Sequence, residues 1–531
     1  MNPRLFSILA VLFLYGCQEN QSPPAPAAPP EGPPNILFIM SDDHAQRAIS
    51  AYTDELIETP NLDRIANEGM IFRNSFVTNS ICAPSRAAIL TGKYSHINGK
   101  IDNLNTFNPE QWTFPEALDG AGYRTSLMGK HHLQAMPRGF DEFRGLVGQG
   151  HYYAPVFVHN GDTLARENGY TTTIITEYAL EELERVTTTE AGKPFMMLYW
   201  HKAPHRHWFP DTGDIPGLLD ERYPVPETLR DDYAGRPAAA HADMRIADMF
   251  TTQDLLIRGN FQDPDPGTGG ARFQTETRDR AAMFENDLTR LTPEELKVWE
   301  PFLDEIGRQW LEVKGTEEEL EWRYQRYMQD YLASVKSVDD NVGRVLDYLD
   351  ETGLADNTIV IYTSDQGFYL GEHGWYDKRF MYEESHRTPL LIRYPPLIAP
   401  GTEAEALALN IDLAPTLLEL AGLDVPEELQ GRSLVPLFTG QTPEDWRDHI
   451  YYRYYQRMAS YHQVPRHEGV RGERYKLIQF TEPGFEGYEL YDLEEDPSEL
   501  ENRIDDPELA AVQEQLLAEM AELKQDLAVP D

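Results

Sequence analysis

The chain has 531 residues, of which 41% are hydrophobic, so it is long enough for two domains with substantial cores. It carries 89 acidic residues against 46 basic ones, which gives a formal net charge of −43. A surface of that sign repels phosphate backbones, so nucleic-acid binding is the function class that the charge disfavours most. An anionic substrate would need a local basic pocket. The two cysteines, Cys17 and Cys82, permit at most one disulfide.

Residues 1–16 have the features of a signal peptide rather than of a folded segment. Arg4 precedes an apolar run that is too short to span a bilayer as a permanent helix. The run ends in LYGC at residues 14–17, which resembles the lipobox of bacterial lipoproteins, in which the cysteine is lipidated and becomes the mature N-terminus. The alternative is an ordinary secretory signal with an incidental cysteine.

Residues 17–34 are rich in proline and nearly free of large apolar side chains, which predicts an extended tether. With Cys17 lipidated, this tether would hold a globular part away from a membrane. Gln18 after the cysteine, by resemblance to known lipoproteins, favours sorting to the outer membrane. We therefore expect an exported lipoprotein, anchored to a membrane in the outer membrane or periplasm of a Gram-negative bacterium.

Three continuous apolar runs cover residues 35–40, 195–200 and 358–363, a pattern typical of strands buried on both faces. Each run is followed directly by polar residues that carry chemistry. In chain order these are Asp42, Asp43 and His44, then His201, Lys202 and His205, then Asp365 and Gln366. A single Asp or His after a strand is most often a turn residue or a helix cap. Three such strand ends together indicate one site, because sites in parallel sheets form beyond the carboxyl ends of the strands.

Helical patterns fill the intervals between these strands. Residues 292–295 (TPEE) have the form of a capping box, and residues 324–349 repeat apolar side chains at three- and four-residue steps, which predicts a helix packed on the sheet. The alternation of strands and helices predicts an α/β domain with a mainly parallel sheet over residues 35–445. We expect an irregular insertion at about 210–287. From about 446 to 531, short aromatic segments and a last amphipathic stretch predict a smaller antiparallel sheet with a terminal helix.

Cys82 lies in the segment CAPSRAAILTG, residues 82–92, where Pro84 suits the start of a short helix and Gly92 its end. A helix N-terminus attracts anions, and Arg86 adds a fixed positive charge. A small buried cysteine is the ordinary alternative. The segment, however, resembles position for position the C-x-P-x-R…L-T-G signature of the formylglycine-dependent type I sulfatases, in which the cysteine is converted to formylglycine (3-oxoalanine), an aldehyde.

The resemblance extends through most of the chain and implies a metal site. Asp42 and Asp43 match the first metal-binding pair of that family, and Asp365 and Gln366 match the second. With formylglycine 82 they form an all-oxygen set, which suits Ca²⁺. The family fold that the resemblance implies is an alkaline-phosphatase-like, mainly parallel α/β sheet flanked by helices, with a smaller C-terminal antiparallel sheet and helix.

The same resemblance implies the cations that would surround the transferring sulfuryl group. Lys130 belongs to the segment GKHHL at 129–133, which matches a G-K-W-H-L motif, and Lys378 follows a matching LGEHG segment. Together with Arg86 and Ca²⁺ they would neutralise the sulfuryl oxygens before reaction. His131 stands in the tryptophan position and is not counted as catalytic.

Two histidines complete the implied catalytic set. The hydrated formylglycine would supply a gem-diol oxygen as the nucleophile, activated by the metal and Asp365. His205, with Lys378, would protonate the leaving oxygen. His132 would take the second gem-diol proton, so that sulfate is expelled and the aldehyde forms again.

The substrate that this resemblance implies is a sulfated saccharide. Segments 52–62, 148–153 and 377–385 are similar to the subgroup that contains N-acetylglucosamine-6-sulfatases, a similarity shared with bacterial sulfatases for algal and other polysaccharides. We expect hydrolysis of a 6-O-sulfate of N-acetylglucosamine or a related sugar in a glycosaminoglycan or algal polysaccharide. His151, Arg387 and His467 lie in segments that could bind sugar, although a structural role is the simpler reading of each.

Two other functions remain open from the sequence. One is a phosphonate or phosphodiester hydrolase of the same superfamily, against which Lys130, His132 and Lys378 favour sulfate. The other is a glycan-binding surface lipoprotein with a decayed active site, against which the intact charged set argues. The expected partners are a sulfated oligo- or polysaccharide and a formylglycine-generating or sulfatase-maturing enzyme. Because Cys17 and Cys82 are both assigned to modifications, we expect no disulfide.

Overall fold

The computed structural model describes residues 32–261, 271–457 and 462–530, without the side chains of residues 271–279. The signal segment, Cys17 and most of the proline-rich tether lie outside the described residues, so export and lipid anchoring stay predictions. Across the described part of the chain, no helix combines the length and the apolar character that crossing a membrane requires.

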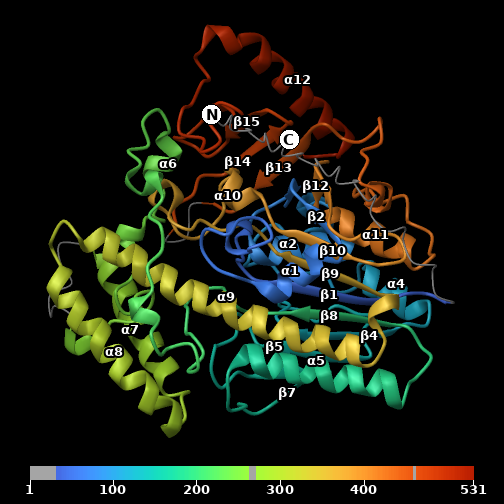
Figure 1. Ribbon diagram of the computed structural model, residues 1–531. Helices are drawn as coiled ribbons and strands as arrows, with labels where there is room; N and C mark the ends of the chain where they lie inside the picture. Colours follow the sequence, from blue (N-terminus) through green and yellow to red (C-terminus); the bar gives the residue numbers. More distant parts are fainter. Residues whose placement is uncertain (1–31, 262–270, 458–461, 531) are drawn as a thin grey trace, which may run out of the picture.

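The largest element of the fold is a ten-stranded sheet (Figure 1). Its strands are β1 (Asn35–Ser41), β2 (Met70–Phe72), β4 (Arg124–Gly129), β5 (Glu142–Leu146), β6 (Phe157–His159), β7 (Asp162–Thr163), β8 (Phe195–Trp200), β9 (Thr358–Ser364), β10 (Leu390–Arg393) and β11 (Thr402–Ala404). Their order is β11-β2-β10-β9-β1-β8-β4-β5-β6-β7. The central strands β9, β1, β8, β4 and β5 pair in parallel, and β10 runs antiparallel to β9, so the expected mainly parallel sheet is confirmed. Strands β3 (Ser75–Phe76) and β12 (Ala408–Leu409) form a separate pair.

Helices cover both faces of the sheet. The helices of the described residues are α1 (Pro60–Asn67), α2 (Cys82–Thr91), α3 (Ser95–Asn98), α4 (Phe114–Gly120), α5 (Thr171–Thr188), α6 (Pro237–His241), α7 (Ala271–Leu288), α8 (Pro293–Val313), α9 (Glu319–Glu351), α10 (Glu383–His386), α11 (Leu413–Leu420) and α12 (Ala510–Asp526). Leu37 and Ile39 of β1 join a core with α1, α5 and α9, whereas Ile36, Phe38 and Met40 join a second core with α2, α4 and α11. Alternate residues of β1 thus face opposite layers, which is why its sequence is continuously apolar.

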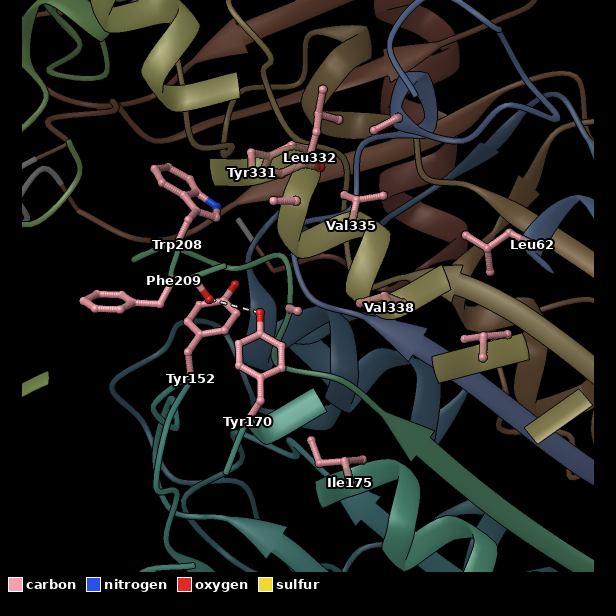
Figure 2. Packing of buried hydrophobic residues seen from close by; sticks show 14 of the residues in the cluster. Leu62, Tyr152, Tyr170, Ile175, Trp208, Phe209, Tyr331, Leu332, Val335 and Val338 are labelled. Carbon is pink, nitrogen blue, oxygen red and sulfur yellow. Dashed lines mark hydrogen bonds between the residues drawn. The ribbon is translucent and has the colours of Figure 1, made fainter. Parts of the chain in front are cut away.

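Helix α9 is the long helix that the apolar repeat predicts. Its side chains Tyr331, Val335 and Val338 are fully buried and pack in one cluster with Trp208 and Ile175 (Figure 2). The hydroxyl group of Tyr331 also makes hydrogen bonds. The Tyr331 hydroxyl donates a hydrogen bond to the carbonyl oxygen of Asp43 (2.9 Å) and accepts one from the backbone N–H of Ala45 (2.9 Å). The core helix therefore holds the loop that follows β1.

The capping box expected at residues 292–295 is confirmed at the start of α8. The backbone N–H of Glu295 donates to Thr292 Oγ1 (3.3 Å), and the backbone N–H of Thr292 donates to Glu295 Oε2 (2.6 Å). The expected irregular insertion at 210–287 is wrong at its end, where α7 is a helix. The glycines and prolines of this segment stop at Gly270, and the residues of α7 contain neither.

The C-terminal part forms the smaller antiparallel sheet that its sequence predicts. Strands β13 (Ile450–Tyr454), β14 (His467–Arg471), β15 (Tyr475–Phe480) and β16 (Gly487–Asp492) pair in chain order. Helix α12 packs on this sheet through Leu516 and Met520, in one cluster with Tyr451 and Leu477. Figure 1 shows this unit above the large sheet.

Candidate active site

The three strands expected to deliver polar residues are neighbours in the sheet. Strands β9, β1 and β8 run parallel side by side, so their carboxyl ends lie at one edge. Asp42 and Asp43 follow β1, Asp365 and Gln366 follow β9, and all four are fully buried. The backbone N–H of Asp43 donates to Asp365 Oδ1 (3.2 Å), which ties the two strand ends together.

Cys82 is the first residue of α2 and enters the same cluster. Ile81 before it is extended, and Gly92 ends the helix in the left-handed region at φ 64°. Pro84 is therefore the third residue of the helix, not the first as the sequence suggested. The Cys82 thiol donates to Asp42 Oδ1 (3.3 Å), and Gln366 Nε2 lies 3.8 Å from its sulfur. Burial raises the pKa of the thiol to about 12, so the unmodified side chain is no thiolate nucleophile at neutral pH.

Three buried cations from three different elements surround these acidic groups. Arg86 Nε of α2 donates to Asp365 Oδ2 (2.9 Å). Lys130, which follows β4, forms an ion pair with Asp42. Lys378 Nζ lies 2.6 and 2.7 Å from the two carboxylate oxygens of Asp43. Although burial opposes it, the charge of Asp43 raises the pKa of Lys378 above its ordinary value, so this lysine is a cation in the folded protein.

Gly129 makes the approach of β4 to β8 possible just before Lys130. Its φ is 114°, and a Cβ at this position would lie 1.9 Å from the carbonyl oxygen of Trp200. The backbone N–H of Lys130 donates to that same carbonyl oxygen (2.8 Å). A residue other than glycine would therefore push Lys130 and the following histidines away from the strand ends.

The acidic residues fit a calcium ion. Carboxylate oxygens of Asp42, Asp43 and Asp365 all lie within 4.8 Å of one another. Burial, with the charge of Asp365 adding to it and that of Lys378 opposing it, raises the pKa of Asp43 to about 6. Gln366 Oε1 is buried and has no hydrogen-bond partner among the described residues. An all-oxygen set with an unused amide oxygen is the donor chemistry that a hard divalent cation prefers.

His205 and His132 both lie next to this cluster. His205 Nε2 is 3.7 Å from Asp43 Oδ2, and its Nδ1 hydrogen-bonds the carbonyl oxygen of Arg206. Because a carbonyl can only accept, Nδ1 carries the hydrogen and Nε2 is the atom available for proton exchange. Burial lowers the pKa of His132 well below its ordinary value, with the charges of Lys130 and Arg86 adding to the effect. Among the described residues, no hydrogen bond joins His132 to Cys82.

A cavity of about 590 Å³ opens beside the cluster, lined by His205 and Lys378. Its outer wall comes from α7, the 147–153 loop and the C-terminal part, which contributes His462. The sequence motifs assign no individual role to several lining residues. They are Asn103, Gln149, Lys202, Arg206, His207, Arg280, Asp287, Arg290, Asp377, Arg379 and His462. Lys202 carried a usable signal because it follows a buried strand. Gln149, Asp377 and Arg379 carried one because they lie in the segments 148–153 and 377–385. The others did not.

The remaining histidine and arginine candidates separate into two groups. His151 lines the cavity, with Nδ1 2.6 Å from Asp287 Oδ1. Arg387 instead pairs with Glu383 (2.5 Å), and His467 is buried and accepts a hydrogen bond from the backbone of Met381 (3.1 Å). His131 packs its ring edge on Phe143. Arg387 and His467 thus have structural partners, and of the three sugar-binding candidates His151 lines the cavity.

Comparison with known protein families identifies the class of enzyme to which this fold and cluster belong. The model of the sulfatase family matches residues 34–423, and that of the C-terminal part of N-sulphoglucosamine sulphohydrolase matches residues 371–526. The chain therefore belongs to the sulfatase family, and it is a sulfuric ester hydrolase.

Individual relatives within the family are similar to this chain over most of its length. The chain is 43% identical to an N-acetylglucosamine-6-O-sulfatase of Bacteroides thetaiotaomicron, over 96% of this chain and 88% of that protein. It is 26% identical to the human N-acetylglucosamine-6-sulfatase, over 79% of this chain and 67% of that protein. A solved structure described as a complex with its substrate D-glucosamine-2-N,6-O-disulfate matches with a TM-score of 0.86 and 42% identity, over 94% of this chain and 99% of the other.

We predict that Gly129→Ala lowers sulfatase turnover at least ~100-fold, because displacement of catalytic groups by about 1 Å costs that much. Gly122→Ala is the matched control. Gly122 also has a positive φ (91°), but a Cβ there would meet open space. Turnover and thermal unfolding of both variants test this. Equal activity in the two variants would show that the contact with Trp200 does not position Lys130.

Proposed function

We propose that the chain removes the 6-O-sulfate of N-acetylglucosamine or a related sugar in a sulfated saccharide, using formylglycine made from Cys82 and a bound Ca²⁺. The supporting observation is the position of Cys82 at the start of α2, in contact with Asp42 and Gln366 inside a buried ring of cations. The 43% identity to an N-acetylglucosamine-6-O-sulfatase supports the substrate.

Asp42, Asp43, Asp365 and Gln366 would hold the metal, beside residue 82. When present, Ca²⁺ supplies positive charge at the sulfuryl oxygens and formylglycine supplies the nucleophilic oxygen. The chain's own cations then bind and orient the sulfate. Arg86 lies against Asp365, and Lys130 and Lys378 lie against Asp42 and Asp43, so all three cations stand at the cluster before the substrate arrives.

His205 would deliver a proton to the leaving oxygen from Nε2 in its imidazolium form, in which Nδ1–H stays committed to the carbonyl oxygen of Arg206. The Tyr152 hydroxyl donates to the carbonyl oxygen of His205 (2.8 Å) and fixes this segment against the cavity wall. His132 removes the proton from the residue 82 side.

The cavity supports a saccharide of limited size. Its volume of about 590 Å³ falls in the ordinary range of small-ligand pockets. Its lining includes the aromatic residues Tyr152, Tyr153 and Phe209, which suit a sugar ring, and the amide residues Asn103 and Gln149, which suit its hydroxyls. Export and a lipid anchor at Cys17, proposed from the first 34 residues, would place this cavity where extracellular saccharides are degraded.

Cys82→Ala should abolish release of sulfate while leaving the thermal unfolding temperature nearly unchanged, because the removed atom is one small buried group. The protein is produced together with a formylglycine-generating or sulfatase-maturing enzyme. A mass measurement of the peptide that contains residue 82 then shows whether the thiol has become an aldehyde. Near-normal sulfate release by Cys82→Ala would contradict the proposed nucleophile.

The substrate is tested by comparing N-acetylglucosamine 6-sulfate with N-acetylglucosamine 3-sulfate and with a phosphodiester. We expect kcat/KM for the 6-sulfate to be at least ~10-fold the other values, because misplaced ester groups leave polar groups of the site unpaired. Preference for the phosphodiester would favour the phosphonate or phosphodiester hydrolase alternative. That alternative shares the fold, as a phosphonate monoester hydrolase of Silicibacter pomeroyi matches with a TM-score of 0.65 at 22% identity. Binding of the sugars without any hydrolysis would favour a decayed site.

A further inference from the structure

We propose that Lys202 is a substrate-binding residue whose ammonium group takes an anionic sulfate oxygen of the sugar. The inference rests on the proposed function and assigns a role to a residue outside the set that the sequence motifs identify.

Lys202 stands at the point where β8 meets the cavity. It is the second residue after the strand and is 4% exposed, and its side chain lines the cavity together with His205. Its Nζ lies 4.5 Å from the centre of the Tyr152 ring. Because Tyr152 also holds the carbonyl oxygen of His205, the ammonium group is fixed next to the residue proposed to protonate the leaving group.

The ammonium group of Lys202 has no hydrogen-bond or ion-pair partner among the described residues, apart from its contact with the ring. Every other buried lysine of the described chain has an oxygen partner. Lys100 bonds a backbone carbonyl, Lys130 and Lys378 pair with Asp42 and Asp43, and Lys476 pairs with two glutamates. Burying an unpaired ammonium is costly, so the exception indicates a partner that arrives with the ligand.

The surroundings of Lys202 favour an anion as that partner. Burial lowers the pKa of Lys202 to about 8, against the attraction of Asp287 on α7 and Asp43 in the acidic cluster. Asp287 lines the cavity with Lys202, and the proposed sulfate-binding residue Lys378 lines it as well. Arg280 and Arg290 line that same outer wall. An anionic oxygen would supply the missing partner of Lys202 and favour its charged form.

Two sulfate groups could supply this oxygen. One is the 6-O-sulfate that is cleaved, and the other is a second sulfate on the same sugar, as in the D-glucosamine-2-N,6-O-disulfate of the related complex. The chemistry of the contact is the same in both cases. Comparing a singly with a doubly sulfated sugar distinguishes the two sources.

The test uses Cys82→Ala as the parent, so that binding is measured without turnover. Lys202→Met is added to it, with Lys202→Arg as the charge-conserving variant. Lys193→Met is the matched control, because Lys193 lies just before β8 with a side chain that is 62% exposed. Calorimetric titration measures the affinity for N-acetylglucosamine 6-sulfate, glucosamine N,6-disulfate and unsulfated N-acetylglucosamine.

We expect Lys202→Met to weaken binding of a sulfated sugar at least ~10-fold, as loss of one charged contact does. Binding of the unsulfated sugar and of all ligands to Lys193→Met should be unchanged, and Lys202→Arg should recover part of the affinity. Weakening for both sulfated sugars would identify the cleaved sulfate as the partner, and weakening for the disulfate alone would identify the second sulfate. Unchanged affinity for both in a folded Lys202→Met protein would overturn the proposal.

If the proposed substrate is wrong, the experiment gives a different result. In that case the parent itself would not bind either sulfated sugar, and inorganic sulfate then serves as the probe in thermal unfolding. If Lys202→Met does not fold, Lys202→Gln replaces it as the uncharged variant. Sulfate should stabilise the parent more than the uncharged variant, and equal stabilisation would overturn the role of Lys202.

Discussion

The close approach of three buried carboxylates is the constraint on which the active site depends. Asp42, Asp43 and Asp365 are brought within a few ångströms of one another by the parallel pairing of β1 and β9, and all three side chains are fully buried. Like charges at such distances in a medium of low dielectric constant repel strongly. The fold can hold them only because cations enter the cluster, and each comes from a different element. Arg86 comes from α2, Lys130 from the end of β4 and Lys378 from the loop after β9.

The buried cations also explain how a strongly acidic protein could bind an anionic substrate. A protein of net charge −43 repels a sulfated saccharide at long range. The net charge of the cavity lining is opposite in sign to that of the whole chain, because lysines and arginines outnumber aspartates among the lining residues. Salt screens the long-range repulsion and leaves the buried contacts nearly intact. Selection of the anion is therefore a short-range property of a few buried side chains.

The sequence predicted those parts of the molecule that local patterns determine. Runs buried on both faces revealed β1, β8 and β9, the apolar repeat revealed α9, and polar residues after the strands revealed Asp42, Asp43, His205 and Asp365. The Cys82 segment carried the family resemblance. The lining of the cavity could not be predicted in the same way, because His462, Arg280 and Asn103 come from loops and helices far apart in the chain. Helix α7 was missed because its composition merged with that of the glycine-rich segment before it.

Calcium binding by the Cys82→Ala protein tests the central claim most directly, because it depends on the carboxylate cluster and not on formylglycine. Thermal unfolding is measured after chelation and again with added Ca²⁺, with Asp365→Asn as the comparison. The account predicts that Ca²⁺ raises the unfolding temperature of Cys82→Ala and that Asp365→Asn in the same background loses most of this effect. An unfolding temperature of Cys82→Ala that is the same with chelator and with Ca²⁺ would contradict it.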